Sequence, residues 1–300
     1  MILATKIQYN NFEPGEFADQ KDSTYEETIA IIEHFPWEAQ RDHLQIGLTN
    51  PSVTIESLQG SLKLAVYYGG KFVLHYFNAE KQLYTKSFTN YTDSYPYIKA
   101  FFDTDPFDPQ GFKKEITWGL HPSLHFEEQD FHYTLHFSNY GSSLLLAGIL
   151  FFISFLMLAA LLNPHNTMEG RVPLGMLFSI LFFTVIYLLA QLLNHYKYCR
   201  GKVLILSKGH DLFYFGNEEK PQEFNKTNIL DIVTYGTKGR GNTYDGYLVD
   251  VEINFKDGSR INISTMLIQH SVLLGKFAGH TIIDERKILP FIAPSSSIPS

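Results

Sequence analysis

The chain has 300 residues, a single cysteine and a formal net charge of −7. One cysteine excludes an intramolecular disulfide and suits a reducing compartment. The first residues lack the basic and apolar regions of a secretory signal, so we expect no export of the N-terminal part. Residues 1–143 carry a net charge of −9 and residues 194–300 carry +2. The acidic half suits a basic partner, although such surfaces also simply aid solubility.

The first elements along the chain are expected to be irregular and then helical. Residues 1–22 are polar and predict a loop or an irregular strand. Ser23 to Glu26 have the spacing of a capping box, and Ile29, Ile32 and Phe35 follow at helical intervals until Pro36. A second short helix is predicted from Trp37 to about Leu48.

From Ser52 the apolar period changes to two, which predicts an antiparallel meander. Gly69-Gly70 is expected to form a two-residue hairpin loop between strands. Further strands are predicted at Lys71–Phe77 and Leu83–Thr89. Capping residues at 92–94 and Pro96 then predict a helix that packs on the meander.

Three carboxylates follow this helix at Asp103, Asp105 and Asp108. The prolines and glycine around them predict an exposed loop. Calcium binding is one interpretation, but the Gly and Glu of an EF-hand loop are missing. A partner-facing acidic loop and a plain solvated loop are the alternatives. We take the three Asp residues as candidate partner-binding residues.

Four histidines, at 121, 125, 132 and 136, lie in one short segment that resembles a zinc site in composition. Alternation at Phe131, Tyr133 and Leu135 favours a strand, which would place His132 and His136 about 13 Å apart. Two ligands at that distance do not share one zinc ion. We therefore expect no metal and no cofactor.

Two long apolar runs occupy the middle of the chain, at 144–162 and 173–193. Neither contains a charged side chain, and each has roughly the 20 residues that a bilayer requires. The short connection Asn163–Arg171 predicts a membrane hairpin with both flanking regions on one side. Lys197, Arg200, Lys202 and Lys208 follow the second run, so we expect both termini in the cytoplasm. The absence of charge within the spans favours an anchor over a transport pathway.

Short alternating segments after the second run predict strands at 202–209, 211–217, 228–236, 247–255 and 259–267. An amphipathic helix at about 268–279 is expected to close this domain, and residues 293–300 have the composition of a disordered tail. Cys199 lies at the membrane edge, where it is either acylated or inert.

This order of strands and one helix, placed after a two-helix membrane segment, resembles the bacterial pleckstrin-homology-like (PH-like) domains of small membrane proteins. The resemblance implies a small, partly open β-barrel that binds rather than catalyses. The loop Gly236–Gly246 lies where such folds often bind lipid head groups. Lys238 and Arg240 in that loop are therefore candidate lipid-contact residues.

The N-terminal segments KFVLHYFNAEKQLYTKSF and DSYPYIKAFFD are similar to small bacterial immunity proteins, which neutralise toxins by binding.

Walker, nucleophile-elbow, HExxH and Rossmann motifs are absent, so we expect no enzyme. The sequence thus predicts an α+β protein of the bacterial inner membrane that neutralises a cognate toxin and binds no nucleic acid; a basic toxin would suit the acidic half. A membrane-associated scaffold or envelope-stress component is the alternative. The predicted boundaries are 1–140, 141–195 for the hairpin, 196–292 for the PH-like domain and 293–300.

Overall fold

The computed structural model describes residues 1–42, 44, 47–104, 106–117, 121–136, 140–163, 167–235, 248–285 and 291–292. It divides into two compact units. Unit 1 comprises Met1–Asp130 together with Ser207–His210, and unit 2 comprises Phe131–Leu206 with Asp211–Ser300. Unit 1 ends before the predicted boundary at residue 140, and unit 2 contains both the apolar helices and the C-terminal strands.

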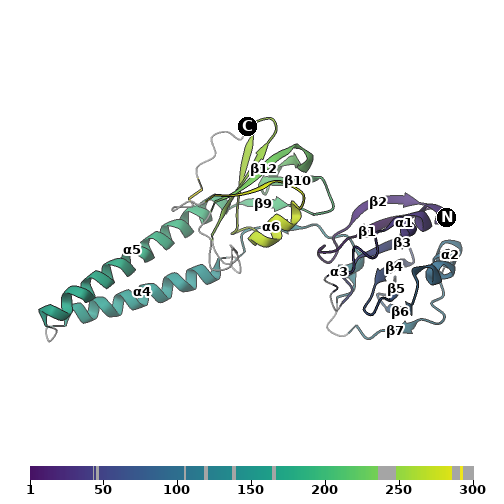
Figure 1. The fold of residues 1–300 in the computed structure, drawn as a ribbon, viewed down its shortest axis with the longest axis horizontal. Helices are drawn as coiled ribbons and strands as arrows, with labels where there is room; N and C mark the ends of the chain where they lie inside the picture. Colours follow the sequence, from purple (N-terminus) through teal and green to yellow (C-terminus); the bar gives the residue numbers. More distant parts are fainter. Residues whose placement is uncertain are drawn as a thin grey trace. The chain divides into compact units, whose positions relative to one another are not determined.

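Unit 1 is built on one seven-stranded sheet in the order β2-β1-β3-β4-β5-β6-β7, with every neighbouring pair antiparallel (Figure 1). The strands are β1 (Leu3–Gln8), β2 (Ala18–Ser23), β3 (Ser52–Ser57), β4 (Gly60–Val66), β5 (Phe72–Asn78), β6 (Leu83–Phe88) and β7 (Lys113–Lys114). The central four form the predicted meander. At its hairpin, Gly69 and Gly70 have φ of 65° and 75°, values that favour glycine.

The helices of unit 1 are α1 (Tyr25–His34), η1 (Tyr91–Ser94, a 3₁₀ turn), α2 (Tyr95–Asp103) and α3 (Ser123–Phe126). The capping box of α1 is one residue later than predicted. Thr24 is the N-cap, and its side chain and backbone exchange hydrogen bonds with Glu27. Pro96 lies in the first turn of α2, where its missing N–H costs little.

One face of the sheet is apolar and is covered by α1 and α2. Ile32 of α1 and Ile98, Phe101 of α2 are fully buried against strand residues such as Leu64 and Leu74. These positions alternate along each strand, as a half-buried sheet requires. The alternation that predicted the meander therefore corresponds to this face.

In the N-terminal region one prediction was confirmed in part and one was wrong. Of the loop and the irregular strand predicted for residues 1–22, the structure has strands, β1 and β2, which extend the sheet and pair with a register shift between Thr5 and Ile7. The described residues between Trp37 and Leu48 form turns rather than a helix. Arg41 in this stretch donates to the carbonyls of Tyr67 and Gly70 at the meander hairpin, so tertiary contacts determine its path.

Unit 2 begins with β8 (His132–Tyr133), continues through the long helices α4 (Gly141–Leu162) and α5 (Met168–Cys199), and then forms its remaining strands. These are β9 (Lys202–Ile205), β10 (Leu212–Asn217), β11 (Lys220–Asn225), β12 (Ile229–Tyr235), β13 (Asp250–Phe255), β14 (Arg260–Ser264) and β15 (Ile282–Glu285), with η3 (Lys226–Asn228) and helix α6 (His270–Lys276) between them. One sheet has the order β11-β10-β9-β8 and the other β14-β13-β12-β15.

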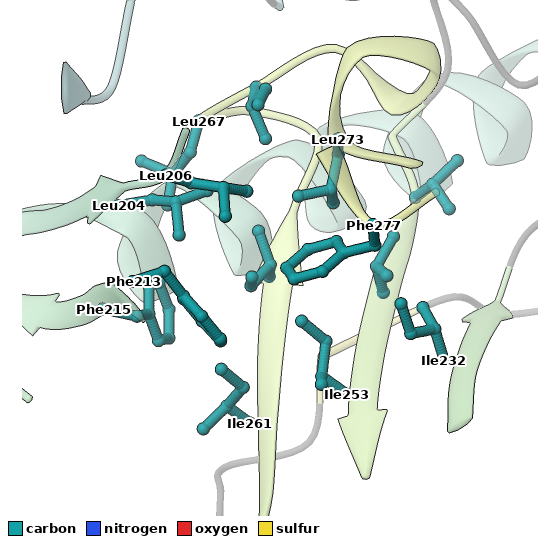
Figure 2. Packing of buried hydrophobic residues seen from close by; sticks show 14 of the residues in the cluster. Leu204, Leu206, Phe213, Phe215, Ile232, Ile253, Ile261, Leu267, Leu273 and Phe277 are labelled. Atoms are coloured by element: carbon teal, nitrogen blue, oxygen red, sulfur yellow. The ribbon is translucent and has the colours of Figure 1, made fainter. Parts of the chain in front are cut away.

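The two sheets of unit 2 enclose an apolar core that α6 closes (Figure 2). Phe277, just after α6, is fully buried and points between Phe213 of one sheet and Ile253 of the other. The ring centroids of Phe277 and Phe213 lie 5.5 Å apart in an edge-to-face arrangement. Because Phe277 fills the space between the two sheets, one helix is enough to close this core.

The apolar helices α4 and α5 lie side by side as a hairpin (Figure 1). Both are long and apolar enough to span a membrane, and they contain the predicted spans 144–162 and 173–193. Most of their side chains are exposed; Leu145 and Phe183, for example, are 66% and 68% exposed. Ser154, Ser179 and Thr184 each donate to a carbonyl one turn earlier, so these hydroxyls are satisfied within the helices.

The C-terminal fold differs from the predicted barrel in closure and in strand number. The described strands form two separate sheets and do not close into a barrel. The strand predicted from the alternation at Phe131, Tyr133 and Leu135 is present as β8, which pairs with β9 across the hairpin. Two strands were not predicted: the charged β11, and β15, which pairs in parallel with β12. These strands are short or largely exposed, so they carry little apolar periodicity.

Candidate functional site

Of the three predicted acidic residues, Asp103 is the last residue of α2 and Asp108 lies in the following loop, and both are exposed. Asp105 lies outside the described residues. The loop is fixed at Gln59, which donates to the Thr104 carbonyl at 3.0 Å and accepts from the Phe107 amide. Phe107 is buried beneath it. The two described carboxylates are therefore accessible on an anchored loop.

The candidate lipid-contact residues Lys238 and Arg240 lie outside the described residues, together with the rest of the loop Gly236–Gly246. The histidine-rich segment 121–136 lies within the described residues, with His125 in α3 and His132 in β8. In the described part of the chain, no three His, Cys, Asp or Glu side chains are grouped as a metal ion requires.

The second face of the unit 1 sheet buries two lysines. Lys6 of β1 and Lys63 of β4 flank Thr54 of β3 in register, and neither lysine exceeds 1% exposure. The Lys6 ammonium donates to Glu56 Oε1 at 2.5 Å and to the Phe126 carbonyl at 2.6 Å. The Lys63 ammonium donates to Gln8 Oε1 at 2.7 Å and to the His125 carbonyl at 3.2 Å. Only one of the two lysines thus has a carboxylate partner among the described residues.

The electrostatics of this face follow from burial. Burial, and secondly the charge of Lys6, lower the pKa of Lys63 to about 7. Burial and then the charge of Lys63 lower the pKa of His125 to about 4. His75 on β5, next to Lys63 in register, has its pKa lowered to about 3 by burial and by the charges of Lys63 and His125. Burial therefore disfavours the charged form of all three groups.

Sequence reasoning missed this face because its alternating residues are polar. Lys6 and Gln8 on β1 resemble solvent-facing residues, although both are buried. One signal was available: Lys63 lies within LKLAV, where an exposed position would more usually carry several polar neighbours. Segment 121–129, which covers the face, has no strong periodicity of its own.

In unit 2, the last turns of α5 belong to the core of the two sheets. Gln191 donates to the Leu248 carbonyl at 3.1 Å, and His195 Nδ1 lies 2.7 Å from Ser264 Oγ. Tyr198 donates to the Asn262 carbonyl at 2.8 Å, and Cys199 is fully buried. The buried thiol is inaccessible to acylation in this fold.

The C-terminal segment also bonds to α5. Asn194 accepts from the Ile292 amide at 2.9 Å and donates to the Ile292 carbonyl at 3.3 Å. The Phe291 ring lies 6.4 Å from that of Tyr187. On the side of the sheets, the contacts of α5 thus extend from β14 to the C-terminal segment. Along α5 they cover about three helical turns.

A cleft of about 500 Å³ lies between the end of β11 and the turn joining β13 to β14. The rings of Phe224 and Phe255 stack at 5.2 Å in its lining. Glu223, Lys256 and Asp257 contribute its charged groups, and Lys256 donates to the Thr227 carbonyl at 2.7 Å. The turn lies at one end of β13. Asp250 lies at the other end of this strand, next to the residues that contact α5.

Comparison with known proteins gives one result for unit 2. A family model described as a PH domain matches residues 129–276. No curated protein matches the chain. The match begins just before β8 and ends with α6, so both apolar helices lie inside it. Residues 129–276 are therefore similar to a PH domain, and they contain the two long apolar helices between the paired strands β8 and β9. We call the two sheets of unit 2, together with α6 and Phe277, the PH-like domain.

Proposed function

We propose that the chain is a membrane-anchored binding protein whose PH-like domain is held at the membrane surface by its own helical hairpin. The observation that carries the proposal is the continuity of α5 with the domain core. Gly170 to Ala190 span about 32 Å at 1.5 Å per residue, close to the hydrocarbon thickness of about 30 Å. Gln191, the next residue, already bonds to the domain. The domain then stands on the bilayer without a linker.

The exposure of α4 and α5 supports this placement. A contiguous apolar surface of this length is costly in water, whereas in lipid it needs no protein cover. The polar side chains of α5 that contact the domain, from Gln191 to Tyr198, lie at the end of the apolar run or beyond it. We place both termini in the cytoplasm, on the basis of the lysines and arginine that follow α5.

Binding rather than catalysis is favoured by the surfaces that the domain offers. The cleft lined by Phe224 and Phe255 lies at the end of β13 remote from α5, where a soluble partner has access. Its mixed apolar and charged lining suits a protein segment. The scaffold role therefore stands ahead of the immunity role, which rests on sequence resemblance alone.

Membrane anchoring is tested by alkaline carbonate extraction of cells that express the full chain. The protein should remain in the membrane pellet. A variant in which Gly141–Ala190 is replaced by a short flexible linker should be released. Release of the unaltered chain would contradict the proposal.

Recruitment is tested with a photoreactive residue at Asn228, whose side chain has no hydrogen bond in the described structure. A discrete crosslinked protein should appear and should be lost when Glu223 and Asp257 are changed to Lys. Photoreactive substitution at Asp231, on the neighbouring strand, is the control.

For the immunity role, the test is the triple change of Asp103, Asp105 and Asp108 to Lys. It reverses the charge of the acidic loop, so a basic toxin should be repelled and cells should lose protection from a neighbouring toxin. Protection that persists would remove the acidic loop from that role.

A further inference from the structure

Residues Ser123–Gln129, which we call the cover segment, lie across the second face of the unit 1 sheet. The segment includes the single turn of α3 and is attached mainly through its backbone. The His125 and Phe126 carbonyls accept from Lys63 and Lys6, and the Gln129 amide donates to the Gly15 carbonyl at 3.0 Å. The Phe126 ring stacks on Phe77 at 5.1 Å. Few apolar contacts other than this ring hold the segment in place.

The groups beneath the cover segment share one property: burial penalises their charged forms. Lys63 has no carboxylate partner among the described residues, and the neighbouring Lys6 adds repulsion. His75 Nδ1 is buried without a hydrogen bond. His125, in the segment itself, bonds to Thr49 Oγ1 through Nδ1 at 2.6 Å. Protonating any of these groups in the closed structure places an uncompensated charge in a low-dielectric site.

We propose that the cover segment is a proton-controlled lid, which opens as the pH falls and exposes Lys63, His75 and His125 to water. Opening lets each group take up a proton with full hydration. Closure expels those protons. The lid requires no ligand, because the closed state differs from the open state in solvation, in the packing of Phe126 and in the hydrogen bonds that hold the segment.

The direction of the pH effect on lid opening follows from proton linkage. Lys63 has a pKa of about 7 when closed and near its ordinary 10.5 when open. Between these values the open state binds one more proton, so each unit of falling pH raises the opening equilibrium constant about tenfold. Below pH 6.5 the histidines act in the same direction, because their pKa values in the closed state are about 3 and about 4.

The other charged groups around the segment do not reverse this direction. Lys6 is paired with Glu56 on β3. On the outer side, Glu128 pairs with His210 of the same unit at 2.9 Å. Both side chains are exposed, so this pair contributes little. Glu127 is exposed, and Glu16 accepts from the Glu13 and Lys208 amides.

The test is hydrogen exchange on the full chain in lipid nanodiscs, corrected for the pH dependence of the intrinsic rate. The reporters are the Glu127 and Gln129 amides, which donate to Ser123 and Gly15. Between pH 9 and pH 7 their protection should fall about 50-fold, because Lys63 begins to hold its proton in the closed state near pH 7. Protection of β4 and β5 should change far less. Constant protection of the two reporters over this range would overturn the proposal.

Variants separate the contribution of Lys63 to lid opening from that of the histidines. Lys63→Met, which keeps the length of the side chain without its charge, should abolish the change between pH 9 and 7 and leave the change below pH 6.5. His125→Gln should reduce only the change below pH 6.5. Lys86→Met, at a lysine that lies over the Tyr97 ring, is the matched control and should behave as the unaltered chain. If Lys63→Met keeps the change in protection between pH 9 and 7, that change does not come from Lys63 and the proposal is refuted. If the variant does not fold, the pH dependence of the unaltered chain is the test by itself.

Discussion

The interiors of the two units differ in what they bury. The PH-like domain encloses aliphatic and aromatic side chains between its two sheets, with Phe277 at the centre (Figure 2). Unit 1 has a comparable apolar face beneath α1 and α2, but its second face buries Lys6, Lys63 and His75. A buried apolar face contributes stability at any pH, whereas a buried cationic face makes stability depend on protons. The comparison predicts different responses to substitution.

The largest effect is expected in the apolar core of the PH-like domain. Phe277→Ala removes a fully buried ring that contacts Phe213, and should cost about 3–5 kcal/mol of unfolding free energy. Hydrogen exchange of β12 and β13 measures this loss. Both tryptophans lie in residues 1–130, so tryptophan fluorescence reports on unit 1 and should not change. A parallel loss of unit 1 fluorescence would show that the two cores unfold together.

On the cationic face of unit 1, breaking the ion pair should be costly. Lys6→Met leaves Glu56 without its partner and the Phe126 carbonyl without its donor. We expect a loss of about 3 kcal/mol, at the lower end for a buried pair because Glu56 is partly exposed. Denaturant unfolding followed by Trp37 fluorescence gives the value. Wild-type stability in this variant would mean that the pair contributes nothing.

A smaller effect is expected at the edge of the apolar face, where Thr24 caps α1. Thr24→Ala removes one half of the capping box with Glu27 and should cost about 1 kcal/mol. The same unfolding assay measures it. Ser57→Ala, at the end of β3, is a control outside any helix. A loss above about 2 kcal/mol, the upper limit for a cap, would indicate that Thr24 does more than cap the helix.

The smallest effect near pH 7 is expected at Lys63. Lys63→Met should change unit 1 stability by less than about 1 kcal/mol or raise it, because replacing an unpaired buried cation by an apolar side chain is commonly neutral or stabilising. Its pH profile is the sharper observable. The unaltered unit should gain stability as the pH rises from 7 towards 10, since the unfolded chain holds a proton that the folded Lys63 has lost. The variant should lack this gain.

Sequence periodicity located the elements whose apolar residues face a core. The meander, α1, α2 and α6 have this property, and their existence and type were predictable. The helices α4 and α5 were predictable for another reason, the length of their uncharged apolar runs. Glycines at 69 and 70 further fixed the hairpin through their positive φ. Boundaries were less accurate, as the one-residue displacement of the α1 cap shows.

Elements stabilised by pairing or by buried polar groups were not predictable in this way. β1 was predicted only as a loop or an irregular strand, because Lys6 and Gln8 resemble exposed residues until their partners on other strands and in α3 are known. β8 has two residues, and its pairing with β9 depends on a contact across more than 60 residues. Of the candidate site residues, only Asp103 and Asp108 fall in the described chain, and nothing in the structure connects them with a partner.

The central claim, that the apolar hairpin crosses a membrane and holds the PH-like domain at its surface, is tested most directly by thiol labelling. The natural thiol, Cys199, is fully buried and contributes no background. Single cysteines are introduced at Thr167 in the connection between α4 and α5, at Lys220 in the PH-like domain and at Asp22 in unit 1, all of which are exposed. A membrane-impermeant maleimide should label Thr167→Cys in intact cells, and the other two only after permeabilisation. Labelling of Lys220→Cys in intact cells, or protection of Thr167→Cys, would contradict the claim.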